Sequence, residues 1–334
     1  MAQTTAAGTS GAARRRYWWQ LRRRWRMLGV FEINPEHEFY HLTSVMKDGM
    51  RALTQASDTL TAEHFKAEET QTHEGFEIQT FAAPVFAKLR RSLDITEEEY
   101  MNSLCLGGCY LQFVSNSKSK ADFFVTNDKR FFLKTQSRRE VRFLLSNLQA
   151  YMDHLEKYPH SLMVRFLGKS GYKYFIVMQS VFYPDERINI RYSKCPHPLL
   201  ISSWFANQVK ADAAFLQELN VLDYSLLLAR QPLHQDELDG KHSLANITRT
   251  DSVLQEFHEH HHRLLPNCKN AIHVIDGPDH RYFVGIIDIF TVYNWKKKLE
   301  NLWKSVHFPG RAFSTVRPNK YSRRFSQWIQ DHTQ

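Results

Sequence analysis

Two largely apolar stretches of this sequence are each interrupted by a single aspartate. Asp288 interrupts a near-continuous apolar run at residues 284–290, and Asp223 lies between apolar runs at residues 221–228. A continuous apolar run is typical of a buried strand, and a lone carboxylate is costly to bury unless it is paired, caps an element or serves a function. The chain therefore needs a substantial core, and both aspartates are candidate functional residues.

The composition agrees with this need for a core. The chain has 334 residues, of which 43% are hydrophobic and 24% are charged, as in ordinary globular proteins. At about 150 residues per folding unit, this length predicts roughly two units. The 4 cysteines are scattered and too few for a disulfide framework, which indicates free thiols in a reducing compartment. No apolar run approaches the ~18 residues that span a bilayer, so we expect a cytoplasmic protein that is soluble or peripheral at membranes.

Positive charge is concentrated at the N-terminus. The formal net charge is +9, and residues 1–26 contain seven arginines and no acidic residue. The rest of the chain is nearly neutral, which argues against a nucleic-acid-binding domain with a basic face. Tryptophan rings prefer the headgroup layer and arginines are attracted to anionic leaflets. The segment in which arginines and tryptophans interleave predicts a membrane-surface anchor, with a nuclear-import or nucleic-acid patch and a solvated tail as alternatives. Its residues are Arg14, Arg15, Arg16, Trp18, Trp19, Arg22, Arg23, Arg24, Trp25 and Arg26.

Alternation and apolar spacing predict an α+β chain of two lobes, in which strands come first and helices dominate later. We expect a strand and then a helix at 76–92, and further strands at 113–114, 123–125, 130–134, 162–167, 172–179 and 282–292. We expect other helices at 36–56, 95–104, 137–157, 204–222, 294–306 and 319–331. An acid- and histidine-rich stretch at 230–270 is interpreted as a linker. Its imidazoles are either solvated or a zinc or nickel site; they are His258, His260, His261 and His262.

Phosphoryl transfer needs residue types that this sequence contains. A lysine on a strand contacts phosphate oxygens, one aspartate orients the acceptor hydroxyl, and a second aspartate holds Mg²⁺. Lys134 ends the alternating strand at 130–134, and Asp223 and Asp288 supply the two carboxylates. Each residue also has a structural interpretation, since a lysine at a strand end is commonly a solvated edge charge.

Several sequence blocks, taken in order, resemble the signature blocks of the phosphatidylinositol phosphate kinases, type I-related. The resemblance covers residues 36–331. Its blocks are FAAPVFAKLR, EYMNSL, NDKRFFLKT, LDYSLLL, GIIDIF, KKKLENLWK and FSTVRPNKYSRRF. It implies a two-lobed lipid-kinase fold, with an antiparallel sheet in the N-terminal lobe and a mixed α/β C-terminal lobe.

The resemblance also implies domain boundaries. Residues 1–35 form a disordered basic and aromatic tail, and residues 36–180 form an N-terminal lobe with a remnant of the nucleotide loop. Residues 181–331 form a C-terminal lobe that carries the two aspartates and a segment like the activation loop. The 230–270 linker lies inside this second lobe.

The resemblance assigns roles to individual residues. Lys134 falls on the lysine that contacts the phosphates of ATP, Asp223 on the catalytic aspartate, and Asp288 on the aspartate that binds Mg²⁺. ATP and Mg²⁺ are therefore the implied cofactors.

The same resemblance places the lipid headgroup further along the chain. Lys297 and Lys298 match paired lysines of the activation loop that contact anionic headgroups, although they could also be a solvated helix start. Glu300 stands where type I enzymes carry glutamate, which implies a preference for phosphatidylinositol 4-phosphate.

Three departures from the family pattern predict weakened catalysis. Ser119 and Lys120 match the nucleotide loop, but its glycines are missing, and a lysine side chain crowds the approach of phosphates to the backbone. The D-L-K-G-S block of the family is absent, with Lys194 as a candidate substitute. In the helix after Lys134, Glu140 is kept but Arg142 replaces a second acid, so the partner of Lys134 is left open.

We therefore expect a pseudokinase or a very weak kinase with at most weak binding of ATP and Mg²⁺. In this interpretation it acts as a scaffold that pairs with type I phosphatidylinositol phosphate kinases, as a homo- or heterodimer, and places them on anionic membranes for phosphatidylinositol 4,5-bisphosphate synthesis. The alternative is an active ATP-dependent 1-phosphatidylinositol-4-phosphate 5-kinase. No nucleic-acid partner is expected.

Overall fold

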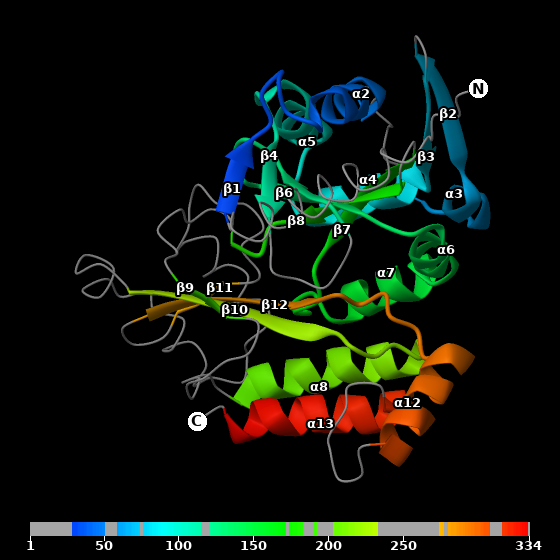
Figure 1. The fold of residues 1–334 in the computed structure, drawn as a ribbon, viewed down its shortest axis with the longest axis vertical. Helices are drawn as coiled ribbons and strands as arrows, with labels where there is room; N and C mark the ends of the chain where they lie inside the picture. The colour runs from blue at the N-terminus through cyan, green and yellow to red at the C-terminus, as the bar shows by residue number, and fades with distance from the viewer. Residues whose placement is uncertain are drawn as a thin grey trace, which may run out of the picture.

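A computed structural model describes residues 29–50, 59–73, 76–114, 121–171, 174–182, 190–192, 203–232, 274–276, 280–307 and 316–332. An eight-stranded sheet forms the upper half of the molecule in Figure 1. Its strands are β1 (Gly29–Glu32), β2 (Glu68–His73), β3 (Phe76–Phe81), β4 (Leu111–Val114), β5 (Phe123–Val125), β6 (Phe131–Thr135), β7 (Phe166–Gly171) and β8 (Tyr174–Gln179). They are hydrogen-bonded in the order β1-β4-β5-β6-β8-β7-β3-β2, and the registered pairs are antiparallel.

Helices accompany this sheet along the chain. They are α2 (Tyr40–Met50), α3 (Ala62–Lys66), α4 (Ala83–Ser92), α5 (Glu97–Met101), the π-helical turn η1 (Asn102–Leu106), α6 (Arg138–Ser146) and α7 (Leu148–Lys157). The single helix predicted at 137–157 is two helices, because the Asn147 side chain donates a 2.8 Å hydrogen bond to the Phe143 carbonyl at the junction. Such local side-chain bonds compete with the continuing helical ladder.

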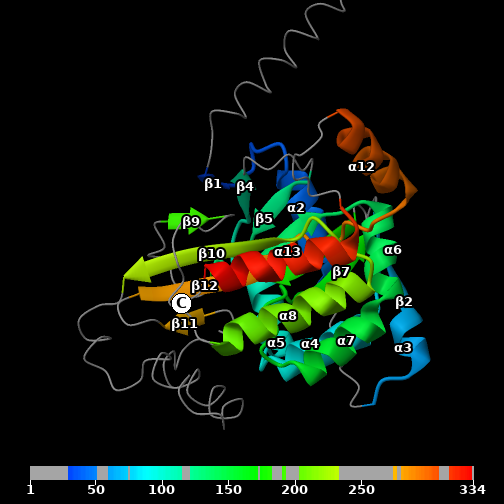
Figure 2. The same ribbon diagram turned by 90° about the horizontal axis from the view of Figure 1, so that it is seen from below.

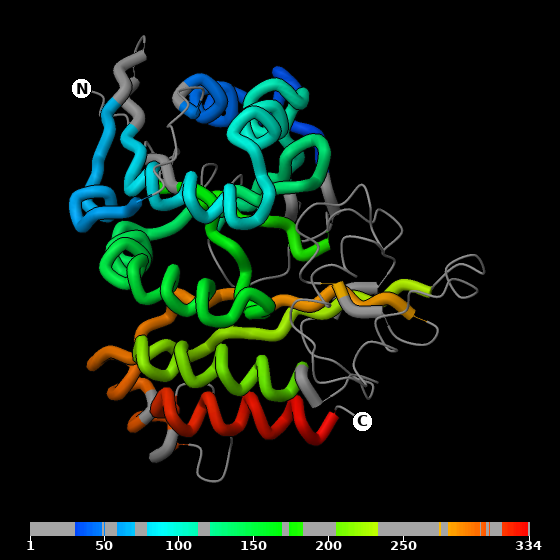
Figure 3. The backbone as a smooth tube through the Cα atoms, turned by 180° about the vertical axis from the view of Figure 1, so that it is seen from behind, coloured from blue at the N-terminus to red at the C-terminus, as the bar shows by residue number. Residues whose placement is uncertain are grey.

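A four-stranded antiparallel sheet organises the second half of the chain. Its order is β11-β12-β10-β9, formed by β9 (Ile190–Tyr192), β10 (Ser225–Pro232), β11 (Val274–Asp276) and β12 (His280–Ile287). The helices α8 (Ser203–Glu218) and α13 (Pro318–Asp331) lie side by side beneath it in Figure 3, which shows the layers from behind. The predicted α+β class, with an antiparallel sheet in the first lobe, is confirmed.

Several predicted boundaries differ from the structure. The strand predicted at 162–167 lies four residues later, as β7. The strand β1 lies inside the range assigned to a disordered tail at 1–35, because it pairs with β4. The linker predicted at 230–270 begins inside β10, whose last residues pair with β12. The strand predicted at 282–292 ends at Ile287, because Asp288 has a φ of 63° and turns the chain out of the sheet.

One hydrophobic cluster joins the two sheets into a continuous core. It includes Phe131 and Ile176 from the larger sheet and Val284 from the smaller one, each fully or almost fully buried. The helix α12 (Trp295–His307) projects from this body beyond the α8 and α13 layer, as Figure 2 shows from below. Among the described residues, no helix combines the length and the apolar character that a membrane crossing requires.

Candidate functional site

An ion pair connects the two sheets at the position that the sequence analysis singled out. Lys134, the fourth residue of β6, donates from Nζ to Oδ1 of Asp288 over 2.9 Å. The lysine side chain is 10% exposed and the aspartate side chain is 48% exposed. The Lys134 ammonium also lies 5.2 Å from the centre of the Phe123 ring. The predicted phosphate lysine and the predicted magnesium ligand therefore meet, although 154 residues separate them in sequence.

The two aspartates lie at the same end of the smaller sheet. Ser225 pairs with Ile287, so the start of β10 and the end of β12 are adjacent, with Asp223 just before one strand and Asp288 just after the other. Both aspartates have a φ of 63°, in the left-handed region. Aspartate tolerates this region better than most residues, because its short polar side chain bonds locally. Backbone conformations of this kind are held at functional sites by the surrounding structure.

A second lysine reaches the other aspartate from α12. Nζ of Lys297 lies 3.3 Å from Oδ2 of Asp223 and 3.3 Å from Oε2 of Glu300. The Asn294 side chain accepts hydrogen bonds from the backbone N–H groups of Lys296 and Lys297, which fixes the first turn of α12. Each candidate carboxylate is therefore neutralised by one lysine in this structure.

Glu300 contacts two lysines of α12, Lys297 and Lys304. Its carboxylate accepts a hydrogen bond from Lys304 and pairs with Lys297. The hydrogen bond from Lys304, followed by the charge of Lys297, holds the pKa of Glu300 below its usual value. The carboxylate thus stays ionised at neutral pH and orients Lys297 toward Asp223.

The two neighbouring lysines of α12 point to different places. Lys297 faces Asp223, whereas Lys298 lines a separate cavity together with Tyr293 and Arg317. Successive residues of a helix are about 100° apart around its axis, so adjacent side chains cannot share one target. The predicted headgroup residues are therefore split between two surfaces.

The partner of Lys134, which the sequence left open, is Asp288. Glu140 is engaged in the cap of α6, where Oε2 accepts hydrogen bonds from the backbone N–H of Ser137 over 2.8 Å and from its hydroxyl over 2.7 Å. Arg142 is exposed on the same helix. Glu140 therefore serves a structural role, and Arg142 faces solvent.

The chemistry of Asp288 fits the predicted magnesium role. Mg²⁺ is commonly held by one or two carboxylates together with substrate phosphates and water. The half-exposed carboxylate of Asp288 suits such a shared site, and Lys134 beside it suits the phosphates. No group of three or more metal-ligating side chains occurs within the described ranges, so a protein-only metal cage is not found there.

Other predicted residues lie outside the described residues. They are Ser119 and Lys120 of the nucleotide loop, Lys194, the histidines at 258–262 and the basic and aromatic segment at 14–26. Conversely, the structure adds Tyr293 and Arg317, which sequence reasoning missed. Arg317 belongs to the FSTVRPNKYSRRF block, so the resemblance located its segment without indicating a cavity.

Comparison with known proteins agrees with this geometry. A family model described as "Phosphatidylinositol-4-phosphate 5-Kinase" matches residues 104–193 and 200–332. A human relative named "Phosphatidylinositol 4-phosphate 5-kinase-like protein 1" is 45% identical, over 97% of this chain and 94% of its own length, and the mouse protein of that name is 42% identical over the same shares. "Phosphatidylinositol 4-phosphate 5-kinase 9" of Arabidopsis thaliana is 26% identical, over 82% of this chain and 45% of its own length.

Proposed function

This chain belongs to the phosphatidylinositol-4-phosphate 5-kinase family, and we propose that it is a weak or inactive member that acts as a scaffold. In this proposal it pairs with catalytically competent type I phosphatidylinositol phosphate kinases and holds them at anionic membranes, where they make phosphatidylinositol 4,5-bisphosphate. It retains at most weak binding of ATP and Mg²⁺. We further propose that the protein is cytoplasmic and peripheral at these membranes.

The observation that carries the low-activity proposal is the contact between Lys297 and Asp223. An aspartate that orients the acceptor hydroxyl acts through a free, negatively charged carboxylate. Here Lys297 lies 3.3 Å from that carboxylate. The missing glycines at the nucleotide loop also support low activity, since positioned phosphate contacts supply most of the rate enhancement in phosphoryl transfer.

When MgATP is bound, the metal supplies charge neutralisation at the transferred phosphate. Asp288 would hold that metal, and Lys134 would turn from the carboxylate to a phosphate oxygen. Asp223 would accept a hydrogen bond from the lipid hydroxyl once Lys297 withdraws. Glu300 is a positioning residue in this scheme because it acts through Lys297, and by resemblance it favours phosphatidylinositol 4-phosphate.

Turnover on vesicles tests the proposal. We expect the full chain to phosphorylate phosphatidylinositol 4-phosphate at least about 10²-fold more slowly than a type I enzyme, as for the loss of one positioned donor. Asp223→Asn is the background control, because it removes the carboxylate but keeps the shape of the side chain. A wild-type rate comparable with type I enzymes would overturn the low-activity proposal.

The same measurement serves the second candidate function, an active 1-phosphatidylinositol-4-phosphate 5-kinase. The meeting of Lys134 and Asp288 across the two sheets favours it, since an inactive chain needs no such arrangement. Turnover that is abolished by Asp288→Asn and by Asp223→Asn alike would establish this alternative.

An exposed apolar face on α12 supports the membrane placement. Four large apolar side chains, each more than half exposed, follow the spacing of one helix face; they are Trp295, Leu299, Leu302 and Trp303. The helix also carries Lys296, Lys298 and Lys304. A helix with such a face and with flanking lysines suits the interface of an anionic membrane. The arginine- and tryptophan-rich segment at 14–26 adds a second basic and aromatic element.

Recruitment of a type I kinase tests the scaffold role. We expect such a kinase to sediment with anionic vesicles more strongly when this chain is present, because in this proposal the chain binds both the kinase and the membrane. Trp295→Ala combined with Trp303→Ala should reduce this recruitment several-fold, with the exposed Gln327→Ala on α13 as a matched control. Equal sedimentation with and without the chain would contradict the role.

A further inference from the structure

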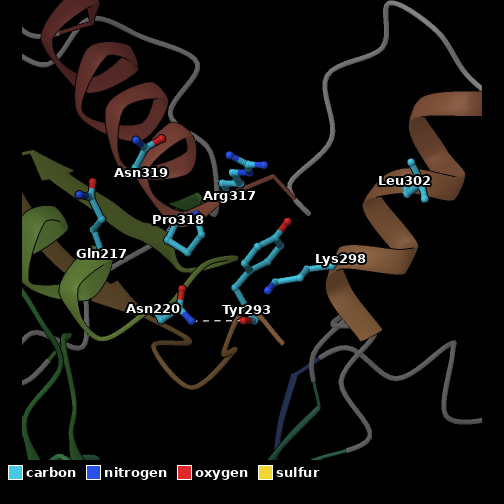
Figure 4. Close-up of a pocket in the computed structure, with 8 residues that line it drawn as sticks. All are labelled: Gln217, Asn220, Tyr293, Lys298, Leu302, Arg317, Pro318 and Asn319. Atoms are coloured by element: carbon cyan, nitrogen blue, oxygen red, sulfur yellow. Dashed lines mark hydrogen bonds between the residues drawn. The ribbon is translucent and has the colours of Figure 1, made fainter. Parts of the chain in front are cut away.

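The helix α13 begins beside the chain that leads into Asp223. Figure 4 shows the start of this helix, Arg317 and Pro318, at a cavity that Asn220 also lines. Asn220 lies three residues before Asp223, and its side chain donates to the Tyr293 carbonyl over 3.3 Å. The first turn of α13 therefore lies next to the segment that precedes this aspartate.

One turn into α13, the Tyr321 side chain reaches the residue that directly follows Asp223. Its hydroxyl donates a hydrogen bond to the Tyr224 carbonyl. The two tyrosine rings also meet edge to face, with their centroids 4.8 Å apart and their planes at 74°. Tyr224 is buried, so a hydrogen bond to its carbonyl is costly to lose. Tyr321 thus fixes the residue after Asp223 through a contact that spans 97 residues of sequence.

The next residue of α13, Ser322, anchors this helix to the rest of the lobe. Its hydroxyl donates to the Ala213 carbonyl of α8 over 3.1 Å, and the Ser322 residue is buried. Because Ser322 is held against α8, the adjacent Tyr321 reaches Tyr224 from a fixed support. Side chains on rigid elements hold a site more precisely than side chains on loops.

The backbone of Asp223 needs such support. Its φ of 63° lies in the left-handed region, and a non-glycine residue keeps this conformation only when the surrounding structure holds it. On the preceding side, the Leu222 backbone N–H donates to the Thr291 carbonyl over 2.9 Å. On the following side, Tyr321 holds the Tyr224 carbonyl. The chain is therefore held on both sides of Asp223.

The Tyr321 hydroxyl stays a donor at neutral pH. Burial raises its pKa, and the negative charge of Asp223 raises it further. The hydroxyl therefore keeps its proton well above neutral pH, and the hydrogen bond to the Tyr224 carbonyl persists while the Asp223 carboxylate is ionised.

We propose that Tyr321 is a positioning residue for Asp223, because its hydrogen bond to the Tyr224 carbonyl fixes the backbone that aims the Asp223 carboxylate. In this structure that carboxylate faces Lys297, with 3.3 Å between Oδ2 and Nζ. With Lys297 withdrawn, the same backbone would aim the carboxylate at the acceptor hydroxyl. The inference deepens the proposed function, but its test needs no turnover, so each of the two can fail while the other stands.

Carbodiimide coupling of the full chain tests the role of Tyr321. The reagent joins a carboxylate to a neighbouring amine as an amide, with loss of water, and mass spectrometry of the digested protein measures each joined pair. We expect Tyr321→Phe to lower the yield of the product between Asp223 and Lys297 by about threefold or more, in line with the loss of one hydrogen bond. The product between Lys134 and Asp288 is the internal reference, and its yield should not change.

Tyr151→Phe is the matched control. Tyr151 is a buried tyrosine on α7 whose hydroxyl donates to the Val164 carbonyl over 2.8 Å. Each variant therefore loses one phenolic hydrogen bond to a backbone carbonyl, and urea unfolding should show similar losses of stability. Only Tyr321→Phe should lower the yield at Asp223. An unchanged yield in Tyr321→Phe, an equal fall in Tyr151→Phe, or an equal fall of the reference product would overturn the proposal.

Discussion

Single residues set the electrostatics of the candidate site around Asp223 and Asp288. Asp223 and Asp288 share a φ of 63° and the same end of the smaller sheet, and each faces one lysine. The Asp288 side chain is 48% exposed in its pair with Lys134, so the pair contributes at most about 1 kcal/mol to stability. The arrangement is therefore better explained by chemistry at the centre than by a need for stability.

The left-handed backbone at Asp288 predicts an order of stability among substitutions. Asp288→Asn and Asp288→Gly should unfold at similar urea concentrations, because both residues tolerate a positive φ. Asp288→Ala should be less stable than Asp288→Asn by about 1 kcal/mol, since alanine gains nothing locally from this conformation. Urea unfolding followed by circular dichroism measures the order. An alanine variant as stable as the asparagine variant would show that backbone strain is not decisive.

At the scale of elements, the helices α7 and α8 are joined by a buried polar contact. Asp212 of α8 is fully buried, and its Oδ1 lies 2.8 Å from Nε2 of His154 on α7. Its Oδ2 accepts a 2.7 Å hydrogen bond from the Leu162 backbone, and Gln208 donates to Oδ1 over 3.1 Å. This one carboxylate holds two helices and the chain that leads into β7, so it supports the layer beneath the functional site.

We predict that removal of the Asp212 carboxylate causes a large loss of stability. Asp212→Ala should lower the free energy of unfolding by about 3 kcal/mol or more, because it leaves buried donors without an acceptor. Asp153→Ala is the control, since Asp153 is an exposed acid on α7 whose carboxylate, among the described residues, bonds only to Gln149 of its own helix. Urea unfolding of both variants checks the difference. Equal, small losses would mean that the contact between the two helices is replaceable.

At the scale of the whole molecule, one core encloses several tyrosines from both halves of the chain. Burial raises the pKa of Tyr151 to about 12, and its hydroxyl donates to the Val164 carbonyl over 2.8 Å. Burial also raises the pKa of four further tyrosines, which are Tyr100, Tyr110, Tyr224 and Tyr321. The folded protein therefore keeps phenolic protons that the unfolded chain releases near pH 10.

This difference predicts the pH dependence of stability on the alkaline side. Between pH 10 and about pH 12 the folded state binds more protons than the unfolded state, so stability is fully present below pH 10 and falls as the pH rises. Melting temperatures at pH 9, 10 and 11 should fall progressively, as this proton balance requires. Tyr151→Phe should show a shallower fall, because it removes one titrating group. Melting temperatures that stay constant across this pH range would contradict the raised pKa values of the buried tyrosines.

Local sequence patterns were sufficient to predict many of the helices and strands. The hairpin of β5 and β6 and the helices α8, α12 and α13 were predicted close to their bounds, since alternation and helical periodicity record which side of an element is buried. The strand β10 was missed, because its second half, Arg230–Pro232, reads as polar and is held in the sheet by pairing with β12. Pairing of this kind depends on residues that lie about fifty positions away.

The sequence by itself determined the family and the α+β class, and it singled out Lys134, Asp223 and Asp288 as candidate site residues. Only the tertiary structure decided which charges meet: Lys134 pairs with Asp288, Lys297 pairs with Asp223, and Lys298 joins Arg317 at a separate cavity. The physical reason is that residue spacing fixes direction only within one helix or strand. Contacts across 154 and 74 residues depend on how two sheets and the projecting helix pack together.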